Sequence, residues 1–277
     1  MSSPTLCCVI PTLNSGQTLE FTLLSLQAQQ LKSLEMVVVD SGSTDETLAI
    51  CARYGVTPLY MAPGNMYRAI NAGFATSRAD WFCYLNSDDL TYPGSLSRLL
   101  AEGIATEADV VYGDCDYLDA AGRFLHSFAA AQPDELFSLF RCRRMGFAQP
   151  ASLFRRSIFL ELKGFDESYR YRADADFFLR ALAAGKQFAR CPAPPVACFR
   201  IHQGQFSNRE RAAGDDEATR LFGKPQYRPS LRDWRVAVAW HGRNLPHYLL
   251  RVLRASLLSQ GLRLPRSIEP PSTPPTS

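Results

Sequence analysis

An apolar run in the first third of the chain ends in an amide and two adjacent carboxylates. The run WFCYL, residues 81–85, is followed by Asn86, Ser87, Asp88 and Asp89. A strand that delivers several oxygen-bearing side chains to one point is typical of a ligand site at the edge of a sheet. Strands also end in ordinary polar turns, in which Asp and Ser are common. From these residues alone, both interpretations stay open.

Two earlier apolar runs end in similar groups. The run 6–12 ends at Thr12 and is followed by Asn14, and the run 35–42 leads into the acidic stretch 40–45. Open α/β sheets bind ligands in a crevice at the carboxyl ends of their strands. If the three runs are neighbouring parallel strands, their polar groups meet in one crevice, which favours the ligand site over a turn.

Strand-like and helix-like segments alternate through the first half of the chain, which predicts an α/β fold with a Rossmann-like, mostly parallel sheet flanked by helices. The second helix has clear start and stop signals: Ser43 and Glu46 fit a capping box, Asp45 suits a helix N-terminus, and Gly55 follows the last turn. The expected strands are 6–12, 35–42, 57–62 and 81–85, and the expected helices are 16–30, 44–54 and 66–75.

The second half has a different pattern. VVYGDCDYLD and RFLHSFA, joined at Ala121-Gly122, are expected to form a hairpin added to the sheet, and PAPPVACFRIH is expected to form another strand. The proline-rich end, SIEPPSTPPTS, predicts a disordered tail. The expected domains are an α/β domain over 1–210, with halves 1–120 and 121–210, a basic helical extension over 211–264, and a tail over 265–277.

Composition excludes several classes of protein. Hydrophobic residues make up 46% and charged residues 21% of 277 residues, as in an ordinary globular protein, and a net charge of +3 gives no reason to expect nucleic-acid binding. The eight cysteines form neither a CxxC pair nor a zinc-like cluster. The first residues lack a signal-peptide pattern, and no apolar stretch is long enough to span a membrane, so a cytoplasmic location is expected.

The C-terminal extension is strongly basic. Residues 228–266 contain eight arginines and a single acid, Asp233, interleaved with tryptophan, tyrosine and leucine. Interfacial helices have this composition, so attachment to the anionic inner face of the plasma membrane is one interpretation. A helical pair packed on the α/β domain or on another subunit, and hence an oligomer, is the alternative. Pro246 is expected to break the segment into two helices.

Six motifs, in order across residues 6–207, resemble the inverting family 2 glycosyltransferases with a GT-A fold, in particular bacterial enzymes of surface-polysaccharide synthesis. They are IPTLN (10–14), VVVDSGSTDET (37–47), YLNSDD (84–89), GFDESY (164–169), DADFFLRALAAGK (174–186) and FRIHQGQFS (199–207). The resemblance implies transfer of a sugar from a nucleotide-sugar donor to a hydroxyl of a saccharide or lipid-linked saccharide acceptor, with inversion of the anomeric centre.

The resemblance also implies a divalent cation, Mn²⁺ or Mg²⁺, which offsets the charge of the leaving diphosphate. The DxD signature of the family corresponds here to Asn86-Ser87-Asp88, followed by Asp89. Asp88 is then the principal metal ligand and Asp89 supports the site, while Asn86 and Ser87 contact the donor or a metal-bound water. His202 is a further candidate ligand, with a structural histidine as the alternative. Replacing the usual first Asp by Asn86 removes one negative charge, which lowers the expected metal affinity.

Donor-binding residues are implied on the first two strands. Asp40 matches the position that recognises the donor base, and a carboxylate can accept the imide N–H of uracil, which favours a uridine nucleotide; its alternative is an Asx-type turn. Ser43 lies beside it in the same motif. The segment Pro11, Thr12 and Leu13 resembles the backbone that lies along the base.

Two further donor residues have open alternatives. Asn14 either belongs to the donor site or caps the first helix. Arg68, in NMYRAINAG, either approaches the diphosphate or is a solvated arginine on a helix.

The catalytic base is expected at the start of the helix near residue 174. The resemblance places it in an acidic motif, here Ala173-Asp174, which is followed by Asp176. Residues two apart on a helix point about 200° apart, so Asp174 and Asp176 cannot both face the crevice. Asp176 can pair with Arg180 four residues later. Asp174 lies at the edge of an apolar face, where partial burial would raise its pKa while the helix N-terminus opposes that rise. We therefore expect Asp174 to be the base, with a helix cap as the alternative.

Two alternative functions lack their sequence motifs, and a third stays open. A nucleotidyltransferase would need a glycine-rich basic loop after the first strand, and a Rossmann dehydrogenase would need GxGxxG; neither is present. A catalytically inactive, donor-binding homologue stays open because Asn86 and Ala173 depart from the acidic residues usual in the family.

Overall fold

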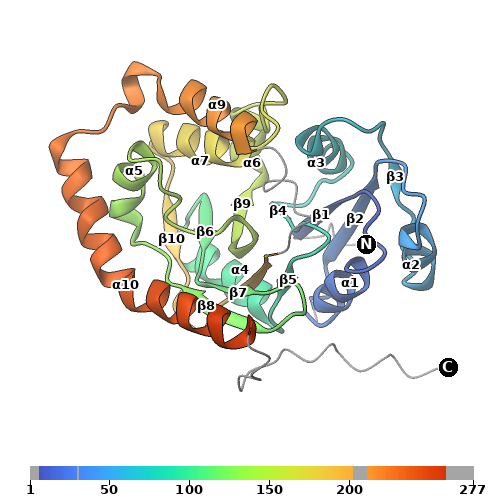
Figure 1. Cartoon of the computed structure of the whole chain (residues 1–277). Helices are drawn as coiled ribbons and strands as arrows, with labels where there is room; N and C mark the ends of the chain where they lie inside the picture. The colour runs from blue at the N-terminus through green and yellow to red at the C-terminus, as the bar shows by residue number, and fades with distance from the viewer. Residues whose placement is uncertain (1–5, 30, 202–210, 260–277) are drawn as a thin grey trace.

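The computed structural model describes residues 6–29, 31–201 and 211–259 (Figure 1). The main sheet has seven strands in the order β10-β6-β9-β4-β1-β2-β3, and a second sheet has four strands in the order β5-β11-β7-β8. The main-sheet strands are β1 (Leu6–Thr12), β2 (Leu34–Asp40), β3 (Leu59–Tyr60), β4 (Trp81–Tyr84), β6 (Val110–Tyr112), β9 (Ser152–Arg155) and β10 (Phe188–Arg190). All neighbouring pairs in it are parallel except those of β9 with β4 and β6. The α/β class and the mostly parallel sheet are confirmed.

Helices cover both faces of the main sheet. On β1, Cys7 and Val9 belong to one buried cluster, while Leu6, Cys8 and Ile10 belong to the other. Strands buried on both faces are continuously apolar because neither set of side chains meets water. The first cluster includes residues of α3 (Met66–Ala75), α5 (Pro133–Arg141), α6 (Arg156–Glu161) and α7 (Ala173–Ala183), and the second those of α1 (Leu19–Gln27), α2 (Thr47–Arg53) and α4 (Ser95–Ala105).

Helix α3 begins and ends where the sequence predicts, but α2 does not begin with the expected capping box. Its N-cap is Glu46, and no side chain caps it. Ser43 instead donates its hydroxyl hydrogen to Asp40, and Asp45 accepts from the backbone N–H of Gly16 in the β1–α1 loop at 2.8 Å. The polar residues before α2 therefore join neighbouring strand ends together, a role that local sequence does not reveal.

The segment expected to be one strand, VVYGDCDYLD, is divided between the two sheets. Its first part is β6 in the main sheet, and its second part is β7 (Cys115–Leu118) in the small one. The expected hairpin is confirmed, because β7 pairs antiparallel with β8 (Phe124–Phe128). The small sheet is completed by β5 (Leu90–Thr91), which directly follows the acidic pair, and β11 (Ala197–Arg200).

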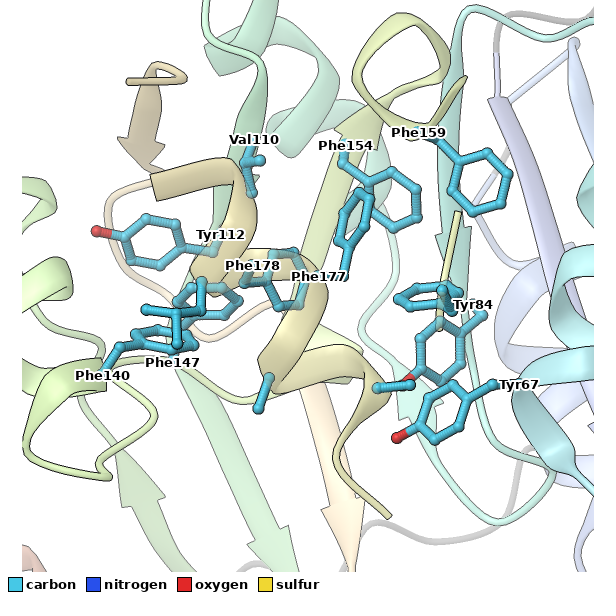
Figure 2. Close-up of a cluster of buried hydrophobic side chains, with 14 of the residues drawn as sticks. Tyr67, Tyr84, Val110, Tyr112, Phe140, Phe147, Phe154, Phe159, Phe177 and Phe178 are labelled. Atoms are coloured by element: carbon cyan, nitrogen blue, oxygen red, sulfur yellow. The ribbon is translucent and has the colours of Figure 1, made fainter. Parts of the chain in front are cut away.

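An aromatic cluster fixes α7 against the main sheet (Figure 2). The ring of Phe177 lies 5.0 Å from that of Phe154 on β9, and the ring of Phe178 lies 4.9 Å from that of Phe147. The cluster continues to Tyr67 on α3 and Tyr84 on β4, whose rings meet edge to face at 6.4 Å. Edge-to-face rings at such distances pack favourably. The start of α7 is therefore held at a defined place beside the end of β4.

The C-terminal part packs on the rest of the chain through α9 (Arg211–Phe222), a short 3-10 turn η2 (Pro225–Tyr227) and α10 (Leu231–Ser259). Helix α10 passes beside α5 and then along β8 (Figure 1). The expected break at Pro246 is wrong, since α10 continues through this residue. Proline removes one helical hydrogen bond, but the turns on either side of it are held by packing on α5 and β8. None of the described helices has the length and apolar character required to cross a membrane.

Candidate functional site

The three polar strand ends converge as the sequence predicts. Strands β4, β1 and β2 are neighbours in the sheet and run parallel, so their carboxyl ends lie at the same edge. The hydroxyls of Ser15 and Ser87 lie 2.7 Å apart and connect the end of β1 to that of β4. The backbone N–H of Asn14 donates to the Ser43 hydroxyl at 2.8 Å, which connects β1 to β2. Open α/β sheets bind ligands at this edge, outside the carboxyl ends of their strands.

Asp40 is buried at the end of β2 and accepts four hydrogen bonds. The backbone N–H groups of Gly42 and Ser43 donate to one oxygen at 2.9 and 3.0 Å. The hydroxyls of Ser43 and Thr12 donate to the other at 2.5 and 3.2 Å. The Asx-type turn is therefore present. A base imide that bound Asp40 would have to replace or share one of these donors, and the Ser43 hydroxyl is the one that can rotate away.

The first strand end is shaped by its backbone. Asn14 adopts a left-handed conformation with φ 52°. Its side-chain oxygen accepts from the backbone N–H of Thr44 at 2.9 Å. It does not cap α1, whose N-cap is Thr18, so that alternative is wrong. Leu13 is half exposed beside it, Thr12 is buried, and Pro11 is partly buried, so a short stretch of backbone and one apolar side chain line the opening.

Asn86 carries an orphaned acceptor at the end of β4. Its side-chain oxygen is buried and has no hydrogen-bond partner, while its NH₂ group donates to Asp89 at 3.3 Å. Buried polar atoms are nearly always satisfied, so such an atom at a strand end indicates a missing partner from a ligand. The neighbouring Asp88 is partly exposed. The amide oxygen and the carboxylate are hard oxygen donors at the same strand end.

Asp89 is fully buried and holds the two sheets together. One carboxylate oxygen accepts from the backbone N–H of Arg200 on β11 at 3.0 Å, and the other accepts from Asn86. The guanidinium of Arg200 donates to the backbone carbonyl of Asp88 at 3.1 Å. Burial, followed by the charge of Asp88, raises the pKa of Asp89, and the hydrogen bonds from Arg200 and Asn86 oppose that rise. Asp89 therefore fixes the position of Asp88 from inside the protein.

The donor set fits a hard divalent cation that shares its coordination with a phosphate ligand. Mg²⁺ is often bound by one or two carboxylates with the remaining positions taken by water and substrate phosphates. Within residues 6–29, 31–201 and 211–259, no three His, Cys, Asp or Glu side chains converge on one point. The orphaned Asn86 oxygen and the Asp88 carboxylate are the groups available. The candidate ligand His202 lies outside the described residues.

Asp174 lies at the N-terminus of α7, beside the aromatic cluster. The hydroxyl of Tyr67 donates to its carboxylate at 3.1 Å, and the backbone N–H of Ala175 donates to the same oxygen at 2.8 Å. Burial raises the pKa of Asp174, and these two hydrogen bonds and the charge of Arg172 oppose the rise. The expected direction of the pKa shift is confirmed, as is the expectation that the helix N-terminus opposes it. A partly exposed carboxylate with a raised pKa is a candidate for proton transfer.

Asp176 has the structural role predicted for it. Its carboxylate pairs with Arg180 at 2.6 Å, and the guanidinium of Arg180 also donates to the carbonyls of Leu162 and Gly164. Asp176 is buried within this network, while Asp174 is partly exposed. The two acids of the motif therefore face different surroundings.

Arg68 is exposed on α3, and its backbone N–H donates to the side chain of the N-cap Asn65. Three residues that position the site were missed by sequence analysis: Tyr67, Arg200 and Glu217. Tyr67 and Arg200 lie inside motifs already noted. Those motifs do not indicate that Tyr67 binds Asp174 or that Arg200 binds Asp89. Glu217, on α9, accepts from the backbone N–H groups of residues 170, 171 and 172 at 2.7 to 3.1 Å, immediately before α7 begins.

The chain matches a known family model. The model described as glycosyl transferase family 2 matches residues 7–162. The succinoglycan biosynthesis protein ExoO of Rhizobium meliloti (strain 1021) is 30% identical over 227 residues, which cover 74% of this chain and 63% of that protein. A PGL/p-HBAD biosynthesis glycosyltransferase of Mycobacterium bovis (strain BCG / Pasteur 1173P2) is 30% identical over 198 residues, covering 66% and 72%. An uncharacterised glycosyltransferase of Rickettsia prowazekii (strain Madrid E) is 28% identical over 191 residues, covering 64% and 58%. The chain thus spans 58% to 72% of the length of these relatives.

Solved structures share the fold. S. aureus TarS 1-349 in complex with UDP-GlcNAc matches with a TM-score of 0.65 at 17% identity, over 94% of this chain and 76% of that one. A mannosyltransferase from Pyrobaculum calidifontis in complex with GDP-Man and Mn²⁺ matches with a TM-score of 0.62 at 16% identity, over 96% and 78%. At this identity the likeness shows the fold alone, and it confirms the expected GT-A architecture.

Proposed function

The chain belongs to glycosyl transferase family 2, and from that premise we propose that it transfers a sugar from a uridine diphosphate sugar to a hydroxyl acceptor with inversion, in polysaccharide or glycoconjugate biosynthesis. The observation that carries the proposal is the position of Asp174. It has a raised pKa, is partly exposed, and is joined through Tyr67 and Tyr84 to the strand end that bears Asn86 and Asp88. The proposed base and the proposed metal-binding strand end are thus neighbours.

In the proposed reaction, Asp174 acts as the general base. Its carboxylate accepts the proton of the acceptor hydroxyl while the acceptor oxygen forms a bond to the anomeric carbon. The bond from that carbon to the diphosphate oxygen breaks at the same time, and the nucleoside diphosphate leaves with the electron pair. One direct displacement gives inverted configuration. The Tyr67 hydroxyl and the Ala175 N–H hold the carboxylate in place.

The donor side of the proposal rests on the strand ends. Asp88 and the side-chain oxygen of Asn86 would hold Mn²⁺ or Mg²⁺, with Asp89 fixing Asp88 from behind. A divalent cation bound there supplies positive charge to the leaving diphosphate. Base recognition is assigned to Asp40 and Ser43, with residues 11–14 along the base, Ser87 near the donor, and Arg68 near the diphosphate.

The acceptor side is assigned to residues 121–210 and the donor side to residues 1–120. We propose a saccharide or lipid-linked saccharide acceptor, and attachment of the protein to an anionic membrane through residues 228–266. The relatives give limited support for the acceptor class, since one is named for succinoglycan biosynthesis and another for PGL/p-HBAD biosynthesis.

A second candidate is a nucleotide-sugar-binding homologue without activity, which Asn86 and Ala173 favour because both replace acidic residues usual in the family. Incubation of the full chain with UDP-, GDP- and TDP-sugars, with and without Mn²⁺, distinguishes the two. Release of nucleoside diphosphate above the protein-free rate is expected for a UDP-sugar, and NMR of the transferred sugar should show inversion. A donor that binds tightly without any hydrolysis or transfer would support the inactive homologue, and a retained configuration would contradict the single displacement.

A further inference from the structure

Helix α10 exposes a row of apolar side chains that the described part of the protein does not cover. We name the outer stripe as Trp234, Val238, Leu245, Leu249 and Val252, each more than half exposed; Val238 is 70% and Leu249 is 61% exposed. Their spacing places them within an arc of about 60° on an ideal helix. Asp233, Ala237, Trp240 and Asn244 are buried and hold the opposite side of α10 against the domain. Contiguous exposed apolar patches of this kind mark interaction surfaces.

Positive charge borders the outer stripe. Arg232 and Arg235 are exposed along one flank of the same helix, while Arg243 on that flank is paired with Glu135 on α5. The single acid of α10, Asp233, is buried and paired with Arg141 on α5 at 3.3 Å, so it does not neutralise this flank. An apolar row bordered by arginines is complementary to the acyl boundary and the anionic headgroups of a bilayer.

A cavity of about 560 Å³ adjoins the stripe at Trp234. Its wall includes Arg141, Arg143 and Arg228 together with the ring of Phe222, over which the guanidinium of Arg143 lies at 6.0 Å. Arginine guanidinium groups favour phosphate through charge and paired N–H donors. The cavity therefore suits a phosphate headgroup, and its apolar wall leads onto the stripe.

We propose that the outer stripe of α10 lies in the headgroup region of an anionic bilayer, with the arginine-lined cavity beside Trp234 accepting a phosphate headgroup. A second copy of the chain is a poorer occupant, because a two-fold contact would bring the arginine flanks of both copies together. Helix α10 also packs on β8, whose sheet reaches Asp89 through β7 and β11. A bilayer bound there lies on the side of the molecule assigned to the acceptor. This inference specifies the membrane attachment included in the proposed function and does not depend on sugar transfer.

Vesicle flotation of the full-length protein tests the proposal without any donor. Protein should float with vesicles of phosphatidylcholine mixed with phosphatidylglycerol, and less with phosphatidylcholine alone or at high salt. Val238→Glu with Leu249→Glu should lower the partition onto anionic vesicles by at least about tenfold. The matched control, Ile104→Glu with Leu160→Glu, changes two equally exposed apolar residues on α4 and α6 and should float like the unchanged protein.

A second pair of variants tests the arginine-lined cavity. Arg143→Gln with Arg228→Gln should weaken flotation several-fold, while Arg78→Gln with Lys163→Gln, which removes the same charge elsewhere, should not. Equal flotation on neutral and anionic vesicles, or equal loss in the stripe and control pairs, would overturn the proposal. So would a dimer in light scattering that the stripe pair dissociates while no variant binds vesicles. A protein that transfers sugar but does not float overturns only this inference.

Discussion

At the scale of single residues, the two acids of α7 separate a chemical role from a structural one. Asp174→Asn keeps the shape of the side chain but cannot accept the acceptor's proton, so transfer should fall by roughly 10²–10⁴-fold. Binding of UDP should be unchanged, because the donor groups come from β1, β2 and β4. Calorimetry with UDP and a transfer assay on the same protein measure both quantities.

Asp176→Asn is the matched control for this experiment. It weakens the buried network with Arg180 and should lower the melting temperature. Its transfer rate should fall much less than that of Asp174→Asn. If Asp176→Asn were the less active of the two variants, Asp174 would not be the base.

Tyr67 should set the pH at which the base works. Its hydroxyl favours the ionised form of Asp174 and so lowers the pKa that burial raises. A general base acts when deprotonated, so activity is lost as the pH falls through its pKa. Tyr67→Phe removes the hydrogen bond and raises the pKa of Asp174, and the acid limb of the kcat/KM profile should move to higher pH while the rate at high pH largely recovers.

Tyr112→Phe provides the control, since it also removes a hydrogen bond from a buried tyrosine, to the carbonyl of Ala131. It should lower stability and leave the pH profile in place. A Tyr67→Phe profile that falls uniformly at every pH would show that Tyr67 serves packing only.

At the scale of elements, local sequence patterns predict where strands and helices lie more accurately than they predict which residues those elements contact. Helix α3 was predicted with its correct ends because its cap, Asn65, accepts hydrogen bonds from its own first turn. The capping box of α2 failed because the Ser43 hydroxyl donates to Asp40 at the end of β2 and accepts from the backbone N–H of Asn14 after β1. Asp89 and Arg200 lie 111 residues apart, and their hydrogen bond could not be read from either motif. The convergence at the strand ends was predictable because parallel strands end at one edge.

Helix α9 should matter to catalysis because it holds the backbone directly before α7. Glu217 accepts three backbone N–H groups directly before α7, so losing its carboxylate would loosen the segment that leads to Asp174. Glu217→Ala should therefore reduce transfer and leave UDP affinity unchanged. Asp216→Ala, an exposed acid on the same helix, should change neither, and a loss of UDP affinity in Glu217→Ala would show that the helix acts on the whole fold instead.

At the scale of the whole molecule, donor binding should stabilise the fold and should require the cation. Hydrogen bonds of Ser15, Asn14 and Ser43 connect the ends of β1, β2 and β4. A ligand that bridges these strand ends would therefore favour the folded state. A ligand at 100 times its Kd adds about 2.7 kcal/mol to the free energy of unfolding. UDP with Mn²⁺ or Mg²⁺ should therefore raise the melting temperature more than UDP alone, and calorimetry should show tighter UDP binding with the metal.

Two substitutions test how far the bound metal contributes to UDP affinity. Asp88→Ala should abolish the enhancement by metal and leave metal-free UDP binding in place, because its carboxylate is the principal proposed ligand. Asn86→Asp restores a second negative charge beside it and should strengthen the enhancement, whereas Asp80→Ala, at an exposed acid before β4, should leave it unchanged. Equal UDP affinity with and without metal in the unchanged protein would contradict the proposed metal site, and the orphaned oxygen of Asn86 would then have to be satisfied by the donor itself.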